Sequence, residues 1–168
     1  METGILRRDE KKKVMEAAVP VGVIAALIPS TNPTSTVIFK AMIALKTANS
    51  IIFSPHPSAA QCIQATVDVI RQALKKFGAP ENAVNYLEYA SLEATQELMD
   101  DRDTKMILAT GGKAMVKSAY SSGTPAIGVG PGNVPCYIEK TANIPLTVER
   151  IIGSKPSIMV SSVLQSNL

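Results

Sequence analysis

The chain has 168 residues, of which 46% are hydrophobic and 18% charged, and its formal net charge is +3 at pH 7. A chain of this length suits one domain that buries roughly 70% of its unfolded surface. Two cysteines are too few for a disulfide framework or a metal site, so we expect no metal and a reducing, cytoplasmic setting. No apolar run is long enough to span a bilayer, and none near the start is typical of a signal peptide.

The basic residues gather near the start of the chain, in the run RRDEKKK over 7–13. Such a run can indicate a nucleic-acid-binding surface, but acids interrupt this one and it contains no aromatic residue. We therefore interpret residues 1–13 as a solvated basic segment and expect neither nucleic acid nor a membrane as a partner.

From residue 19 onward, strand and helix signals alternate along the chain. The expected strands lie at 19–28, 50–53, 83–87, 105–109, 126–129 and 134–139. The expected helices lie at 33–49, 57–78, 91–99, 111–121 and 145–152, and Asn32 and Ser91 are good N-caps. This alternation predicts an α/β fold, a Rossmann-like parallel sheet with helices on both faces and right-handed crossovers.

Helical spacing also predicts which side chains face the core. In the helix over 33–49 these are Val37, Met42 and Leu45, and in the helix over 57–78 they are Cys62, Thr66, Val69, Ala73 and Phe77. Cys136 alternates with Val134 and Ile138 in an expected strand. Both cysteines are therefore expected to be small buried hydrophobic groups.

In open α/β sheets, ligands bind beyond the carboxyl ends of the strands, which selects the loops at 29–32, 54–56 and 110–112. Two of these loops lead into helix N-termini, which suit a pyrophosphate, and Gly111 and Gly112 permit close approach of a ligand. The fingerprint G-x-G-x-x-G is absent, because Gly128, Gly130 and Gly132 precede an expected strand. Spacing alone therefore leaves both a nucleotide site and an unspecific α/β domain open.

Two single residues have two interpretations each. His56 is the only histidine, and its place between two prolines at a helix start fits a structural role as well as a catalytic one. Asn32 fits a plain N-cap as well as a functional amide.

Two longer stretches resemble a known family. They are PVGVIAALIPSTNPTSTVIFKAMIALKTANSIIFSPHPSA at 20–59 and ILATGGKAMVKSAYSSGTPAIGVGPGN at 107–133. Both resemble the CoA-acylating branch of the aldehyde dehydrogenase superfamily, which includes acetaldehyde and propionaldehyde dehydrogenases and the N-terminal half of bifunctional aldehyde-alcohol dehydrogenases. The resemblance implies an incomplete NAD-binding domain at 14–155, and residues 156–168 do not match.

The resemblance also implies a reaction. Such enzymes convert a short-chain aldehyde and CoA to acyl-CoA with reduction of NAD, through a cysteine nucleophile. Asn32 matches the asparagine that donates to the oxyanion, and NADP stays possible as the cofactor. A homo-oligomer is implied, in the cytoplasm or in a bacterial microcompartment. The matching cofactor-binding positions are Ile28, Pro29, Ser30, Thr31, Ser54, Pro55, His56, Gly111, Gly112 and Gly130.

The sequence differs from the hydrolytic members at two informative positions. Ser54 stands where they carry a lysine for the adenosine ribose, which leaves the choice between NAD and NADP open. Gly128 stands where they carry the glutamate that activates water. A thiol acceptor such as CoA ionises more readily than water, so the missing base fits the acylating branch.

The family nucleophile lies in a segment like N-G-x-x-C-x-x-E-Q, soon after a stretch that matches ERIIGSK at 149–155. Here PSIMVSSVLQSNL follows, and no cysteine comes after Cys136. We therefore expect that this chain alone is inactive although it can bind NAD. The alternative is a non-catalytic module that binds nucleotide or packs against full-length subunits.

Overall fold

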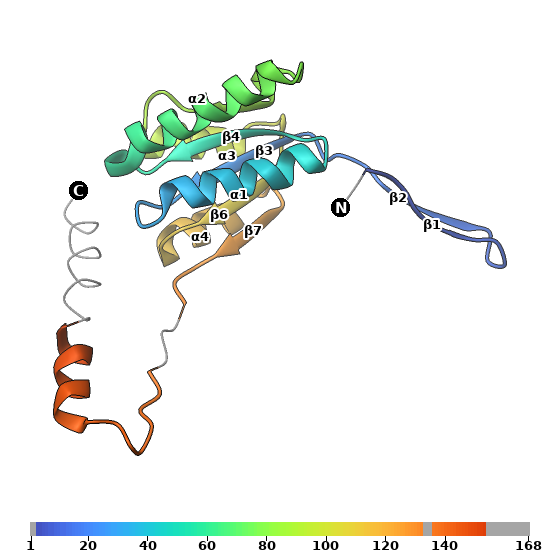
Figure 1. Cartoon of the computed structure of the whole chain (residues 1–168). Helices are drawn as coiled ribbons and strands as arrows, with labels where there is room; N and C mark the ends of the chain where they lie inside the picture. Colours follow the sequence, from blue (N-terminus) through green and yellow to red (C-terminus); the bar gives the residue numbers. More distant parts are fainter. Residues whose placement is uncertain (1–2, 133–135, 154–168) are drawn as a thin grey trace. The chain divides into compact units, whose positions relative to one another are not determined.

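The computed structural model describes residues 3–132 and 136–153. The chain divides into two units, Met1–Pro131 and Gly132–Leu168. The first unit contains an antiparallel hairpin and a parallel sheet covered by helices (Figure 1). Within the described ranges, no helix combines the length and the apolar character needed to cross a membrane.

The main sheet is parallel and has five strands in the order β5-β4-β3-β6-β7. The strands are β3 (Val23–Ile28), β4 (Ser50–Pro55), β5 (Val84–Tyr86), β6 (Thr104–Thr110) and β7 (Ala126–Val129). The helices are α1 (Pro33–Lys46), α2 (Ala60–Lys76), α3 (Leu92–Asp100) and α4 (Lys113–Ser121), with short 3-10 helices η1 (Pro57–Ala59) and η2 (Glu81–Ala83). The predicted α/β alternation is confirmed. The strand order reverses between β3 and β6, which is the switch point of the sheet.

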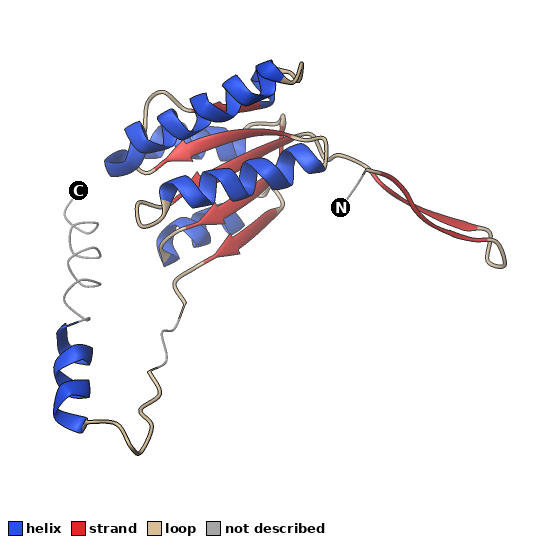
Figure 2. Ribbon diagram, viewed as in Figure 1, coloured by secondary structure: helices blue, strands red, loops and turns tan. Residues whose placement is uncertain are grey.

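Helices cover both faces of this sheet (Figure 2), because successive residues of a strand point to opposite sides. Ile24, Ala26 and Ile28 of β3 pack in one core cluster with residues of α1 and α2. Ala25 and Leu27 pack in the other cluster, with residues of α3 and α4. Since β3 is buried on both faces, it reads in sequence as an unbroken apolar run.

The predicted core face of α2 is wrong. The buried residues are Ile63 and Val67, whereas Val69 and Phe77 are 65% and 82% exposed. A second series, which also includes Ile70 and Leu74, follows the same helical spacing and carries larger aliphatic side chains. That series is the one that packs on the sheet, because it removes more apolar surface from water.

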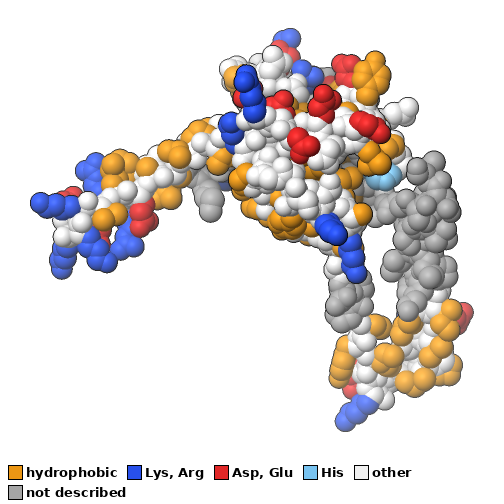
Figure 3. Space-filling view, turned by 180° about the vertical axis from the view of Figure 1, so that it is seen from behind, with side chains coloured by type: hydrophobic (Ala, Val, Ile, Leu, Met, Phe, Trp, Pro, Cys, Tyr) orange, Lys and Arg blue, Asp and Glu red, His pale blue; other side chains and the backbone are white. Residues whose placement is uncertain are grey.

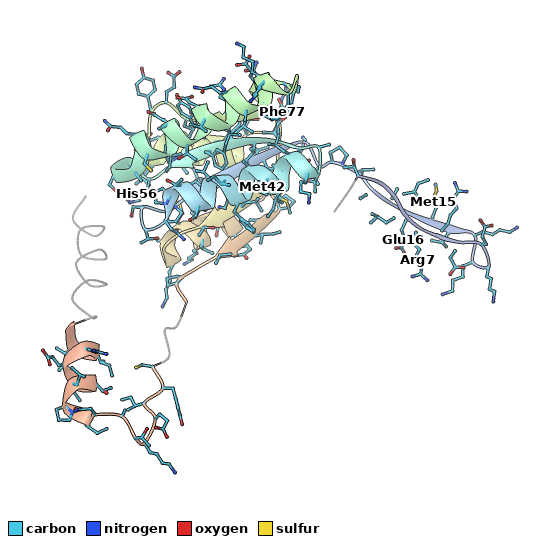
Figure 4. All side chains as sticks on the ribbon, in the orientation of Figure 1. Arg7, Met15, Glu16, Met42, His56 and Phe77 are labelled. Carbon is cyan, nitrogen blue, oxygen red and sulfur yellow. The ribbon has the colours of Figure 1, made fainter. Side chains whose placement is uncertain are left out.

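The core face of α1 is only partly as expected. Val37 is fully buried and Leu45 packs against the core, but Met42 is 57% exposed. Figure 4 shows Met42 on the outer side of α1. The small residues Ala41 and Ala44 are buried instead, which lets the helix lie close to the strands.

An antiparallel hairpin of β1 (Gly4–Asp9) and β2 (Val14–Ala18) was not predicted. Asp9 accepts hydrogen bonds from the backbone N–H groups of Lys11 and Lys12, and this closes the turn. The side chains are largely exposed, and basic ones gather on the hairpin (Figure 3). Neither GILRRD nor VMEAA alternates apolar and polar residues, so the sequence carries no period-2 signal for these strands.

In the second unit, residues 144–153 are helical, which confirms the helix expected at 145–152. Asn143 accepts a hydrogen bond from the backbone N–H of Leu146 and so caps the first turn. The strand expected at 134–139 is wrong over residues 136–139, which adopt no strand, and its first two residues lie outside the described ones. Since no neighbouring strand pairs with this segment in the described unit, its alternating pattern has no sheet to join.

Candidate functional site

The three loops selected from the sequence lie at one edge of the sheet. They follow β3, β4 and β6, and both β4 and β6 pair directly with β3 in parallel. The carboxyl ends of these strands are therefore neighbours, on either side of the switch point. This edge is where open α/β sheets bind ligands.

Asn32 occupies the N-cap position of α1, as predicted, but its side chain does not cap the helix. Its backbone oxygen accepts from the backbone N–H of Thr36 at 3.2 Å and from the Thr36 hydroxyl at 2.7 Å, while its Oδ1 accepts from the Thr31 hydroxyl at 3.3 Å. The Thr36 hydroxyl also lies 3.2 Å from Oδ1, but its one hydrogen points mainly at the closer backbone oxygen. Among the described residues, no hydrogen bond of its Nδ2 is formed. The amide is thus held by its oxygen, and its N–H groups are left to donate to a bound group.

Ser54, at the end of β4, is buried and bonded to α3. Its Oγ lies 2.7 Å from Oγ1 of Thr95, and Thr95 donates its own hydroxyl hydrogen to the carbonyl of Ser91 at 2.7 Å. Ser54 must therefore be the donor to Thr95. Its oxygen keeps acceptor capacity, so its predicted contact with a cofactor ribose could only be as an acceptor unless this pair opens.

His56 follows β4 and precedes α2. Its Nδ1 accepts from the backbone N–H of Ser58 at 3.2 Å and lies 2.8 Å from the hydroxyl oxygen of Ser58. A backbone N–H can only donate, so Nδ1 is the acceptor in the bond with Ser58. His56 therefore caps η1, and Figure 4 shows it at the carboxyl edge of the sheet.

Gly111 and Gly112 lead into α4. Neither has a positive φ. A Cβ at Gly111 would make only ordinary contact with Met115, and one at Gly112 would meet no described atom within 4 Å. The described fold therefore does not itself require glycine at these positions. Open space above a helix N-terminus fits close approach of a phosphate group.

Gly128, by contrast, is required by packing. A Cβ there would lie 2.5 Å from Cγ1 of Val116 and 2.8 Å from Cε2 of Tyr120. The side chains of α4 fill the space that a residue at 128 would need. The packing of α4 therefore leaves no room for a side chain at position 128.

Sequence reasoning missed Lys40. It lies on the core side of α1, is only 4% exposed, and its Nζ donates to the carbonyls of Leu27 and Leu108 at 2.9 and 2.7 Å. Burial lowers the pKa of the Lys40 ammonium to about 7. The available signal was its spacing from Val37 and Ala44, which places it on the buried stripe of the helix.

Both predictions of buried cysteines are wrong. Cys62 is exposed, and its Sγ lies 3.1 Å from Oγ1 of Thr34. Cys136 is exposed as well. Cys62 lies beside the residues of α2 that pack on the sheet, not among them. Cys136 lies in a segment that pairs with no strand in the described unit. Among the described residues, no cluster of histidine, cysteine and acidic side chains could hold a metal ion.

The model of the aldehyde dehydrogenase family matches residues 1–158. The chain belongs to the aldehyde dehydrogenase family. It is 52% identical over 152 residues to an aldehyde-alcohol dehydrogenase of Clostridium acetobutylicum, covering 90% of this chain and 17% of that protein. It is 50% identical to aldehyde-alcohol dehydrogenase 2 of Entamoeba histolytica, with 90% and 18% covered.

Solved structures give the same result. An acetylating aldehyde dehydrogenase from Geobacillus thermoglucosidasius is 55% identical, with a TM-score of 0.79 and coverage of 90% of this chain and 34% of that one. A probable aldehyde dehydrogenase from Listeria monocytogenes is 56% identical, with a TM-score of 0.80 and coverage of 91% and 34%. The expected resemblance to the CoA-acylating branch is confirmed. The chain spans between about a sixth and a third of the length of these relatives.

Proposed function

We propose that this chain is the dinucleotide-binding part of an oxidoreductase that converts a short-chain aldehyde and CoA to acyl-CoA while reducing NAD. The observation that carries this proposal is the meeting of three loops at the switch point, with an unsatisfied amide and two open glycines among them. The family membership and the acetylating relatives support the reaction.

Each part of the proposed site suits a particular part of a dinucleotide. The N-terminus of α4, with Gly111 and Gly112, suits the pyrophosphate because its backbone N–H groups and helix dipole favour anions. The other proposed binding residues lie at or just after the carboxyl ends of the strands: Ile28, Pro29, Ser30 and Thr31 at β3, Ser54, Pro55 and His56 at β4, and Gly130 after β7. Bound NAD would supply the acceptor for the hydride that the aldehyde loses.

NAD is the proposed cofactor, and NADP is the alternative. The selected segment 54–56, at the end of β4, holds Ser54 and His56 but no carboxylate, the group that often binds the ribose of NAD. An engineered glycolyl-CoA reductase that is 44% identical was solved with NADP+. CoA is the proposed second substrate, and a 44% identical propionaldehyde dehydrogenase of Rhodopseudomonas palustris was solved with propionyl-CoA.

Asn32 is proposed to stabilise the oxyanion. Its Oδ1 accepts from the Thr31 hydroxyl, which leaves its Nδ2 to donate when charge develops on a bound aldehyde. Removal of such a donor typically lowers the rate by about 10²–10³. Gly128 is proposed to favour transfer of the acyl group to a thiol, because α4 leaves no room there for a base that could activate water.

The setting is part of the same proposal. A homo-oligomer is proposed, by analogy with the family. Free Cys62 and Cys136 are compatible with a reducing cytoplasm, and a relative from a bacterial microcompartment makes that location the alternative.

A second candidate function is a non-catalytic module that binds nucleotide or packs against longer subunits. The two cysteines favour it, because neither forms a hydrogen bond to a histidine among the described residues and a nucleophilic thiol needs such activation.

The test is an assay of the purified chain with acetaldehyde, CoA and NAD, followed by NADH absorbance, beside a calorimetric NAD titration. Binding without turnover is the expected result. CoA-dependent turnover that is lost in Cys62→Ala or Cys136→Ala would show that the chain carries its own nucleophile. Absence of both binding and turnover would contradict the proposed nucleotide site.

A further inference from the structure

Lys40 connects the two strands that border the switch point. Its Nζ donates to the carbonyl of Leu27 in β3 at 2.9 Å and to that of Leu108 in β6 at 2.7 Å. The loops that follow these strands carry Asn32 and the glycines Gly111 and Gly112. The amine therefore lies beneath the place where the two loops separate, and its bonds fix the spacing of their starting points.

The protonation state of this amine is finely balanced. A neutral amine has two hydrogens, which the two carbonyls accept, whereas an ammonium has a third. Among the described residues, no third acceptor for Lys40 is present, and the side chain is only 4% exposed. Burial without a counter-charge disfavours the ammonium, and the pKa is lowered to about 7. Near neutral pH both forms are therefore populated.

No charged side chain on the described elements around Lys40 pairs with its amine, so burial is the main influence on its pKa. β3 and β4 carry none, and β6 carries only Lys105, whose Nζ donates to the carbonyl of Arg102. α1 also carries Lys46, which is exposed. The neighbouring helix α2 carries Asp68, Arg71, Lys75 and Lys76, all exposed or half-exposed. At the carboxyl edge itself, the described ionisable side chains include His56 after β4, Cys62 near the start of α2, Lys113 at the start of α4, and Glu88, Tyr89 and Glu93 after β5. The three selected loops contain no carboxylate.

We propose that Lys40 is a positioning residue for the dinucleotide and that it takes up a proton when the anionic pyrophosphate binds above it. The inference rests on the proposed function, because it requires a nucleotide at this edge. A nearby anion stabilises the ammonium over the amine, and the effect is large where water is excluded. By linkage, protonation of Lys40 must then raise the affinity for the nucleotide by the same factor.

Proton uptake can be measured by calorimetric titration of the chain with NAD and with ADP-ribose in phosphate and in Tris. The difference in heat between buffers of different ionisation enthalpy gives the number of protons bound. At pH 8 a group with a pKa of about 7 is mostly neutral, so uptake of up to ~0.9 proton per nucleotide is expected. Adenosine, which lacks the pyrophosphate, is expected to produce no uptake.

The variants separate positioning from simple stability. Lys40→Met keeps the length of the side chain, and we expect it to abolish uptake and to lower affinity at pH 6.5 on the order of fivefold or more. Lys40→Gln serves the same purpose if the methionine variant does not fold. Lys46→Met, on the exposed side of the same helix, is the matched control and should behave as wild type.

The outcomes are distinct. Nucleotide binding with uptake that is lost in the Lys40 variants supports the proposal. Binding without uptake by the wild-type chain, or uptake that persists without Lys40, overturns it and leaves the proposed function intact. Failure of every nucleotide to bind refutes both.

Discussion

The backbone N–H of Gly128 donates a hydrogen bond to the hydroxyl oxygen of Tyr120 at 2.9 Å. Gly128 lies on β7, an edge strand of the sheet, and Tyr120 lies on α4. The phenol thus satisfies an N–H that would otherwise be open on the edge, and its ring occupies the space of the absent side chain. Val116 and Tyr120 of α4 therefore restrict position 128 to a residue without a side chain.

Gly128→Ala should lower the free energy of unfolding by about 1–3 kcal/mol, because its Cβ would overlap Val116 and Tyr120. Urea unfolding followed by circular dichroism measures the change. Gly128→Glu should be worse, and adding Tyr120→Ala should recover part of the loss, since the two positions compete for one space. Equal stability of Gly128→Ala and wild type would show that α4 moves away easily.

Gly111→Ala, unlike Gly128→Ala, should affect nucleotide binding more than stability. Its Cβ would make only an ordinary contact with Met115, so the free energy of unfolding should change by less than about 0.5 kcal/mol. Nucleotide affinity should nevertheless fall, because the added methyl group stands where a phosphate would approach the backbone. Calorimetric titration with NAD checks the affinity and thermal unfolding checks the fold. Unchanged affinity would remove the loop after β6 from the proposed site.

Burial of Lys40 should make the free energy of unfolding rise as the pH increases above about 7. Its pKa is about 7 in the folded chain and near its ordinary value of 10.5 in the unfolded one. Between these values the unfolded state binds more protons, so the free energy of unfolding should rise with pH by up to about 1.4 kcal/mol per unit. Urea unfolding at pH 7, 8 and 9 measures the slope. Lys40→Met should lack this rise, and the same slope in both proteins would contradict the burial of a neutral amine.

Much of the sheet could be predicted because its strands are buried on both faces and read as apolar runs between turn residues. The rule that ligands bind at the carboxyl ends of strands then selected the three loops correctly as neighbours. Burial of single side chains was less predictable. Lys40 is buried because two strand carbonyls happen to lie within its reach, and Cys62 is exposed because a neighbouring aliphatic series packs instead. Such choices depend on contacts between elements far apart in the sequence.

The hydrogen bond between Ser54 and Thr95 can be tested because the two hydroxyls have different roles in it. Ser54 donates to Thr95, and Thr95 donates to Ser91. Ser54→Ala removes only the first donor, which should lower the free energy of unfolding by about 0.5–1.5 kcal/mol. Thr95→Val has nearly the same shape but leaves the buried hydroxyl of Ser54 without its acceptor, so a larger loss of about 1–3 kcal/mol is expected. The double variant should lose less than the sum, because no unsatisfied hydroxyl remains. Urea unfolding of the four proteins measures these terms. If the two single variants lose the same free energy, the Ser54 hydroxyl has found another acceptor in Thr95→Val, and its dependence on Thr95 is contradicted.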